Sequence, residues 1–343
     1  MLVLFAAGFA LIVTPFSALA QETLKKIDLG SATKPATGSI THFAVHPLGL
    51  AGGDERGLSR AAKTLESNHH GPLLPVIPAP GFYPADLSYN VFGLTSPPPT
   101  VQSAEQHGVY LNCSPDCWGK PYKFLNNLNE SGMTHITDQY VGAYRDGRYP
   151  PGAGLSATGT VPPILYDSDM IDIAYEAASL LGSGYGHIYH IYLPPGQDVC
   201  FAPGLPCYSP DNPSTFAFCA YHSSFDSPIG HVLYTVEPYA NVAGCQVFPP
   251  SPNGPTVDST ANILSHEVFE TITDPDGTAW LNGYSQALFL DEIGDECSAL
   301  GFTSTSAYFA YGAISLNGQK YEIQPEYSNL LHGCGYSWAA FGW

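Results

Sequence analysis

Two potential metal ligands and a potential base lie within five consecutive residues, His266-Glu267-Val268-Phe269-Glu270. In a helix, His266 and Glu270 would lie on one face, about 6 Å apart at their Cβ atoms. At that spacing an imidazole nitrogen and a carboxylate oxygen can bind the same ion. Glu267 is rotated by one residue and can instead face a water molecule bound there. The stretch therefore predicts half of a metal site with a base beside it.

This HExxE pattern differs by one residue from the HExxH helix, in which two histidines bind zinc and the glutamate acts as general base. Zinc lowers the pKa of a bound water towards neutrality, and Glu267 would take the proton as a carbonyl is attacked. One histidine with two carboxylates should make zinc a weaker Lewis acid and makes harder metals more credible. We therefore expect metal-dependent hydrolysis of a protein or peptide substrate, with zinc preferred over manganese or calcium.

A catalytic zinc ion binds three protein groups and a water molecule, so the site needs a third ligand. The best source is the acidic stretch 291–297, DEIGDEC, which has four carboxylates in seven residues. We expect Glu292 to be this ligand and Asp295 to accept a hydrogen bond from the other nitrogen of His266. The two roles can be exchanged, and the sequence leaves that choice open. In the alternative interpretation, His266 and Glu270 only decorate an amphipathic helix and the acidic stretch is a solvated loop.

Other residues are weaker candidates. His222 and Tyr327 could line a substrate cleft, the first as a donor to a carbonyl and the second as an oxyanion stabiliser. His187 and His190 are expected on opposite faces of one strand, so they cannot share a metal ion there. A glycoside hydrolase with paired carboxylates would leave His266 unexplained. Neither a glycine-rich phosphate loop nor a GxSxG sequence is present, which argues against ATP use and serine-hydrolase chemistry.

Local patterns predict the elements that position these residues. Asp258-Ser259-Thr260 can cap a helix over 261–273, which Asp274-Pro275 then ends. A second helix should follow Asp167-Ser168-Asp169, with an apolar face formed by Ile171, Ala174, Ala177 and Leu180. A shorter helix is expected at 123–128, and strands at 108–111, 187–193, 216–221 and 231–236. This order predicts a mixed α/β (α+β) domain, consistent with a zincin-like fold with disulfide-tied loops.

The N-terminus and the cysteines both indicate export. Residues 1–20 form an apolar run that ends in Ser17-Ala18-Leu19-Ala20, the form of a secretory signal peptide, with an uncleaved anchor as the alternative. The eight cysteines are an even set, which normally pairs in an oxidising compartment. Close spacing favours Cys113–Cys117 and Cys200–Cys207, and for the other four we expect Cys219–Cys245 and Cys297–Cys334.

Composition limits the partners and the compartment. The chain has 11 Lys and Arg residues and a formal net charge of −19, which argues against nucleic acid as a partner. We expect a secreted, extracellular protein without membrane contact after signal cleavage, with the periplasm or a cell wall as alternatives. Residues 21–105 lack cysteine and are punctuated by proline, so we expect a propeptide, linker or arm before the metal-binding domain at 106–343. No expectation about oligomeric state follows.

Several short motifs occur in one order between about residues 106 and 338: Phe218-Cys219-Ala220-Tyr221-His222, Ser265-His266-Glu267 with Glu270, Thr273-Asp274-Pro275, Trp280, Glu292-Ile293-Gly294-Asp295 with Cys297, and Gln324-Pro325-Glu326-Tyr327-Ser328-Asn329. In this combination the chain resembles the phosphate-induced (EXORDIUM-like) secreted family, whose microbial relatives are regarded as zincin-type metallopeptidases. The resemblance implies secretion, a disulfide-linked α/β domain and a metal site at the positions given above. Plant members are discussed mainly as cell-wall growth proteins, so a non-catalytic extracellular or cell-wall interaction protein is the alternative function.

Overall fold

The structure is a computed structural model that describes residues 25–28, 39–43, 86–143, 146–247, 251–282, 292–297 and 314–336, the first two ranges as backbone. The predicted signal peptide and most of the proline-rich segment lie outside the described residues, as does the first residue of the acidic stretch, Asp291.

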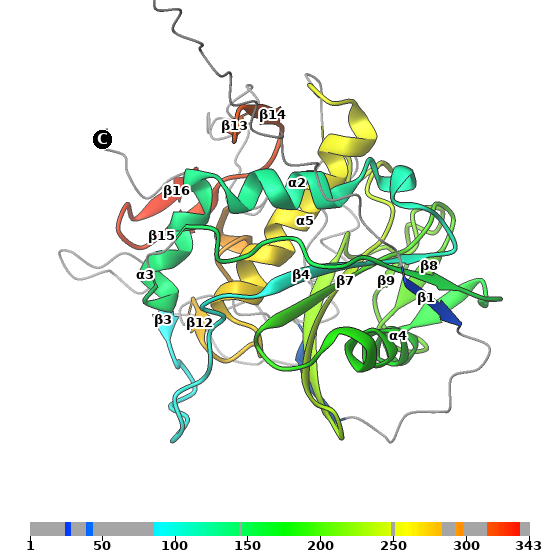
Figure 1. Ribbon diagram of the computed structural model, residues 1–343, viewed down its shortest axis with the longest axis horizontal. Coiled ribbons are helices and arrows are strands. Elements are labelled where there is room, and N and C mark those ends of the chain that lie inside the picture. Colours follow the sequence, from blue (N-terminus) through cyan, green and yellow to red (C-terminus); the bar gives the residue numbers. More distant parts are fainter. Residues whose placement is uncertain are drawn as a thin grey trace, which may run out of the picture.

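A seven-stranded mixed sheet forms the centre of the fold (Figure 1). Its strands lie in the order β1 (Lys25–Asp28), β5 (Leu155–Thr158), β4 (Glu105–Leu111), β7 (His187–Tyr192), β11 (Gly230–Glu237), β10 (Tyr221–Ser227) and β2 (Ser39–Phe43). The first five strands are parallel to one another, whereas β10 is antiparallel to both β11 and β2. Strands from the N-terminal segment therefore border both edges of the sheet.

Helices cover both faces of this sheet (Figure 1). The helices α2 (Pro121–Asn129) and α5 (Pro255–Thr273) lie on one face, and α4 (Asp167–Leu181) lies on the other. Successive side chains along a strand point to opposite faces of the sheet, so the strands contribute to two separate hydrophobic cores. On β7, Ile188 and Tyr192 pack with α2 and α5, whereas Tyr189 and Ile191 pack with α4. None of the helices in the described ranges is long and apolar enough to cross a membrane.

Short elements complete the described fold. The short helices are η1 (Pro115–Trp118), η2 (Gly132–Thr137), α3 (Asp138–Val141) and η3 (Asp295–Cys297). The small sheets pair β12 (Trp280–Leu281) with β3 (Ser88–Tyr89), β13 (Ile314–Leu316) with β14 (Gln319–Tyr321), β15 (Glu326–Ser328) with β16 (Gly333–Gly335), and β6 (Ile164–Tyr166) with β8 (Asp198–Cys200) and β9 (Cys207–Tyr208). The mixed α/β class is thus confirmed.

The helix predicted to follow Asp167-Ser168-Asp169 is α4, but it begins at Asp167, so these three residues form its first turn and Tyr166 is the N-cap. Asp169 accepts a hydrogen bond from the backbone amide of Tyr166 at 2.7 Å, which satisfies a donor at the helix start. The predicted apolar face is right for Ile171, Ala174 and Ala177, which are buried. It is wrong for Leu180, which is 47% exposed because Leu181, the next residue of the helix, packs against the core in its place.

Two predicted boundaries are wrong. The strand expected at 216–221 is β10, which begins only at Tyr221; the apolar residues before it are buried because Phe218 packs against other rings and Cys219 forms a disulfide. The helix expected from residue 261 begins at Pro255, because proline suits the first turn, where its missing N–H costs no hydrogen bond. Asp258 lies within that first turn and accepts the backbone amide of Asn253 at 2.8 Å.

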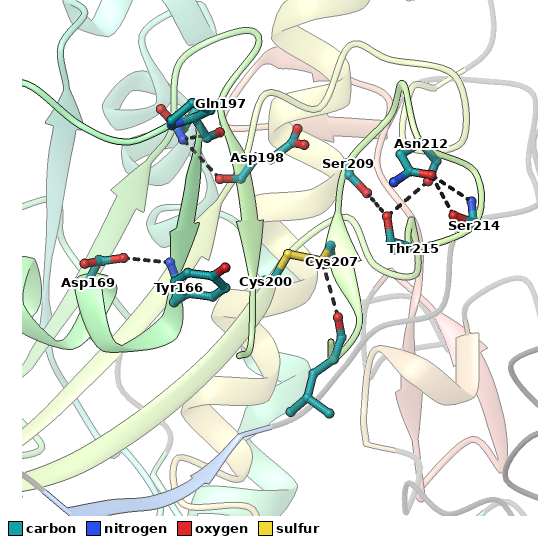
Figure 2. Close-up of a disulfide and its surroundings, with 12 residues drawn as sticks. Tyr166, Asp169, Gln197, Asp198, Cys200, Cys207, Ser209, Asn212, Ser214 and Thr215 are labelled. Atoms are coloured by element: carbon teal, nitrogen blue, oxygen red, sulfur yellow. Dashed lines mark hydrogen bonds between the residues drawn. A yellow bond between two sulfur atoms is a disulfide. The ribbon is translucent and has the colours of Figure 1, made fainter. Parts of the chain in front are cut away.

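All four expected disulfides are present: Cys113–Cys117, Cys200–Cys207, Cys219–Cys245 and Cys297–Cys334. Figure 2 shows the Cys200–Cys207 bridge, which joins the antiparallel strands β8 and β9 beside the start of α4. The Cys297–Cys334 bridge ties η3 to β16 and so fixes the acidic stretch next to the C-terminal hairpin.

Candidate metal centre

The helix α5 carries the HExxE residues into the interior. Val268, Phe269 and Ile272 belong to the core between α5, α2 and the sheet. His266 is only 5% exposed, and Glu270 is completely buried. The helix ends at Thr273 as predicted, so His266 and Glu270 lie one turn apart within regular helix.

The acidic stretch is held against α5 by contacts with the β15–β16 hairpin and with the residues just before β15. The backbone amide of Tyr327 donates to the carbonyl of Ile293, and the side-chain amide of Gln324 donates to the carbonyl of Gly294, both at 3.0 Å. A Cβ atom at Gly294 would lie 2.5 Å from Nδ1 of His266 and 2.9 Å from Oε1 of Glu270. The loop therefore approaches the two helix residues so closely that only glycine fits without a shift.

His266, Glu270 and Asp295 form one group whose potential ligand atoms all lie within 4.8 Å of one another. Nε2 of His266 is 3.2 Å from Oε1 of Glu270 and 3.7 Å from Oδ1 of Asp295. The backbone amide of Asp295 donates to the same Oε1 at 3.2 Å. Asp295 and Glu270 thus both face Nε2 of His266. This position favours Asp295 as a metal ligand over Asp295 as a hydrogen-bond partner of Nδ1, the other ring nitrogen.

His222, Glu270 and Glu292 form a second group of the same size. Nε2 of His222 is 3.2 Å from Oε2 of Glu292. Tyr221 and Phe225 pack in the core on the α4 side of β10, so His222 points to the opposite face, towards α5. The structure therefore places Glu292, the expected third ligand, with His222, and it makes Glu270 common to both groups.

The remaining predicted site residues have different surroundings. Glu267 follows His266 directly on α5 and is completely buried. Tyr327 is also buried, but its hydroxyl donates to Oδ1 of Asp86 at 3.0 Å, so it faces the N-terminal part of the described chain.

Asp274 is a buried carboxyl group that sequence analysis interpreted only as a helix stop. That interpretation is confirmed, because Oδ1 of Asp274 accepts the backbone amides of Thr278 and Ala279 at 2.6 and 2.7 Å. Burial raises the pKa of Asp274 to about 7, although these hydrogen bonds act in the opposite direction. The available signal was its position directly after the end of α5, four residues after Glu270.

A third group, Glu105, His107 and His187, lies on the α4 side of the sheet and was also missed. Nε2 of His107 is 3.1 Å from Nδ1 of His187, which lies on the neighbouring strand. His190 instead contacts Gln106 and Thr235, so the prediction that His187 and His190 face opposite sides is confirmed. The signal was the i, i+2 spacing of Glu105 and His107, which places them on one face, but the register with β7 could not be inferred.

The residues around Glu270 fit a divalent metal ion. The two groups supply imidazole nitrogens and carboxylate oxygens, the ligands that zinc and manganese bind. All five residues (His222, His266, Glu270, Glu292 and Asp295) are at most 5% exposed. Charges buried to this degree are normally paired or coordinated to metals.

Comparisons with known proteins add no relative. No family model matches the chain, and neither a curated protein nor a solved structure matches it. Function must therefore be inferred from the site itself.

Proposed function

We propose that this chain is a secreted, metal-dependent peptidase with a zincin-like domain. In this proposal, zinc is held by His266, Glu270 and Asp295, and Glu267 is the general base. The observation that carries it is the convergence of these three ligands within 4.8 Å, directly beside a buried glutamate in HExxE spacing. Manganese is the alternative metal, since carboxylates outnumber the imidazole in this group. The resemblance to microbial relatives of the EXORDIUM-like family, which rests on the sequence motifs, implies the same class of enzyme and a metal site in the same part of the chain.

The chain's own residues would divide the work as follows. When bound, zinc supplies a Lewis acid and lowers the pKa of its water. Glu267 would accept a proton from the attacking water and return it to the leaving amine, as a general base and then a general acid. Glu270 and Asp295 flank Nε2 of His266 and would hold the ion at that nitrogen as its other two protein ligands. Gly294 would keep the loop close enough for Asp295 to reach that atom.

The four disulfides support the secreted part of the proposal, because disulfides persist mainly in oxidising compartments. Location can be tested separately from activity: expression of the full chain in its source cells should yield extracellular protein that lacks residues 1–20. Intracellular full-length protein would contradict secretion without touching the metal site.

The activity test compares wild type with Glu267→Gln on a protein substrate such as casein, with and without chelator. General-base catalysis contributes about 10²- to 10⁴-fold, so the variant should lose activity by that factor. Its metal content and its melting temperature should stay close to those of wild type, because the substitution conserves shape. Glu176→Gln on α4 is the matched control and should retain full activity, since it lies on the other face of the sheet.

The alternative is a non-catalytic extracellular or cell-wall interaction protein. A wild-type protein that binds zinc but never cleaves any of a broad peptide set would favour it. Equal activity in wild type and Glu267→Gln would remove Glu267 as the base, and an absence of bound metal would overturn the proposal altogether.

A further inference from the structure

Glu270 belongs to both groups of potential ligands on the α5 side of the sheet, one completed by His266 and Asp295 and the other by His222 and Glu292. We infer that this centre binds two divalent ions of the zinc or manganese class, with Glu270 as a bridging carboxylate. This inference rests on the proposed metal site, but it does not depend on peptidase activity.

The number of donors is the first support. A single catalytic zinc ion uses three protein ligands and leaves one position for water. Here five buried side chains from three parts of the chain converge: α5 supplies His266 and Glu270, β10 supplies His222, and the loop before η3 supplies Glu292, with Asp295 as the first residue of η3. One ion leaves two of these side chains without a ligand role, whereas two ions use all five.

The local geometry divides the donors between two ions. The turn around Gly294, closed by a hydrogen bond from the amide of Glu296 to the carbonyl of Glu292 at 3.1 Å, sends Glu292 and Asp295 to different histidines. Oε2 of Glu292 is 3.2 Å from His222, and Oδ1 of Asp295 is 3.7 Å from His266. A carboxylate has two oxygens and can bind one ion with each. Two-metal sites hold their ions about 3.5–4 Å apart, a separation that a bridging carboxylate spans.

The charge of the site is the third support. Besides Glu270, Glu292 and Asp295, the buried residue Glu267 lies on α5. A single divalent cation offsets two of these four carboxylates, and a second cation offsets the other two. Bound cations are a usual means by which a protein holds several carboxylates together away from water.

The test is a metal count by mass spectrometry on the full-length protein, stripped with chelator, reloaded with zinc and desalted. Wild type should hold two equivalents per chain. His222→Gln should hold one, because the loss of a ligand should weaken the second ion by at least the ~10- to 100-fold seen when an outer-shell partner is lost. His187→Gln is the matched control: it belongs to the separate group with Glu105 and His107, and should keep two equivalents.

Each outcome discriminates. One equivalent in wild type overturns the second ion and leaves the single-metal peptidase intact, whereas zero equivalents overturns both. Two equivalents that fall to one only in His187→Gln would place the second ion on the other side of the sheet and overturn the inference. Two equivalents without peptidase activity would reject the proposed function alone. Loading wild type with Mn²⁺ gives a readout that needs no variant: electron paramagnetic resonance should show an exchange-coupled pair, and a spectrum of isolated ions would contradict it.

Discussion

Gly294→Ala tests whether the close approach of the acidic loop to α5 sets the metal site. The φ angle of Gly294 lies outside the left-handed region, so alanine suits the backbone and only the new contact matters. The added methyl would lie 2.5 Å from Nδ1 of His266, about 0.9 Å short of the 3.4 Å at which ordinary contacts begin. Because the neighbours are a ring and a buried carboxylate, the loop or the ring must move by most of that distance.

The magnitude follows from this displacement. Overpacking of a buried site costs about 1–3 kcal/mol, which for a domain of this size lowers the melting temperature by about 2–4 °C per kcal/mol. The effect on metal binding should be larger, since a binding site must be held to within about 0.5 Å. We expect zinc affinity to fall by at least the ~10- to 100-fold that loss of an outer-shell partner causes.

The assay pairs calorimetric zinc titration of chelator-treated protein with thermal melting. Gly132→Ala is the matched control, because no atom lies within 4 Å of its added Cβ and its φ is also outside the left-handed region. If Gly294→Ala bound zinc as tightly as wild type, the loop could not be what holds Asp295 at His266, and the proposed ligand set would be refuted.

Three further predictions concern stability. Removal of the Cys297–Cys334 bridge by a double serine substitution should cost about 4 kcal/mol from loop entropy, against about 2 kcal/mol for Cys113–Cys117, as measured by denaturant unfolding. Burial opposes protonation of His231, but its hydrogen bonds to Asp276 and Asp226 outweigh burial and raise its pKa above 6.5. The protonated His231 should therefore stabilise the fold fully below pH 6.5. This stabilisation should be lost as the pH rises through the raised pKa. Melting from pH 5 to 9 should show this loss in wild type and not in His231→Gln. Chelation should lower the melting temperature of wild type, since an ion at 100 times its Kd stabilises by about 2.7 kcal/mol; an unchanged value would mean that no ion binds the folded state preferentially.

The features that could be predicted from the sequence depend on local spacing. His266 and Glu270 are four residues apart in a helix, a spacing that lets their ligand atoms approach to 3.2 Å. The end of α5 could be predicted from Asp274-Pro275 because these residues directly follow the helix in the sequence. Two of the disulfides likewise join cysteines only four and seven residues apart.

Which of Glu292 and Asp295 lies beside His266 could not be predicted, because it depends on contacts with distant residues. The two carboxylates are three residues apart, and the path of their loop is fixed by hydrogen bonds from Gln324 and Tyr327. The position of His222 beside Glu292 depends on β10 lying next to α5, at the antiparallel side of the sheet. That position follows from the strand order, which no local pattern reveals, and the predicted strand ended at Tyr221, where the observed one begins.

The burial of α5 contradicts the alternative in which His266 and Glu270 lie on the exposed face of an amphipathic helix. An amphipathic surface helix would expose His266 and Glu270, yet they are 5% and 0% exposed, and the acidic residues Glu292 and Asp295 are buried as well. Buried ionic groups are often no more stabilising than apolar side chains of the same volume, and they cost several kcal/mol per ion when their partners are imperfect. A helix that served packing alone would therefore gain from leucine or valine at these positions. The energetic cost of these residues would be offset by a bound cation, and this is the physical argument for the proposed metal site. The proposed proteolysis depends in addition on Glu267, the next residue on α5.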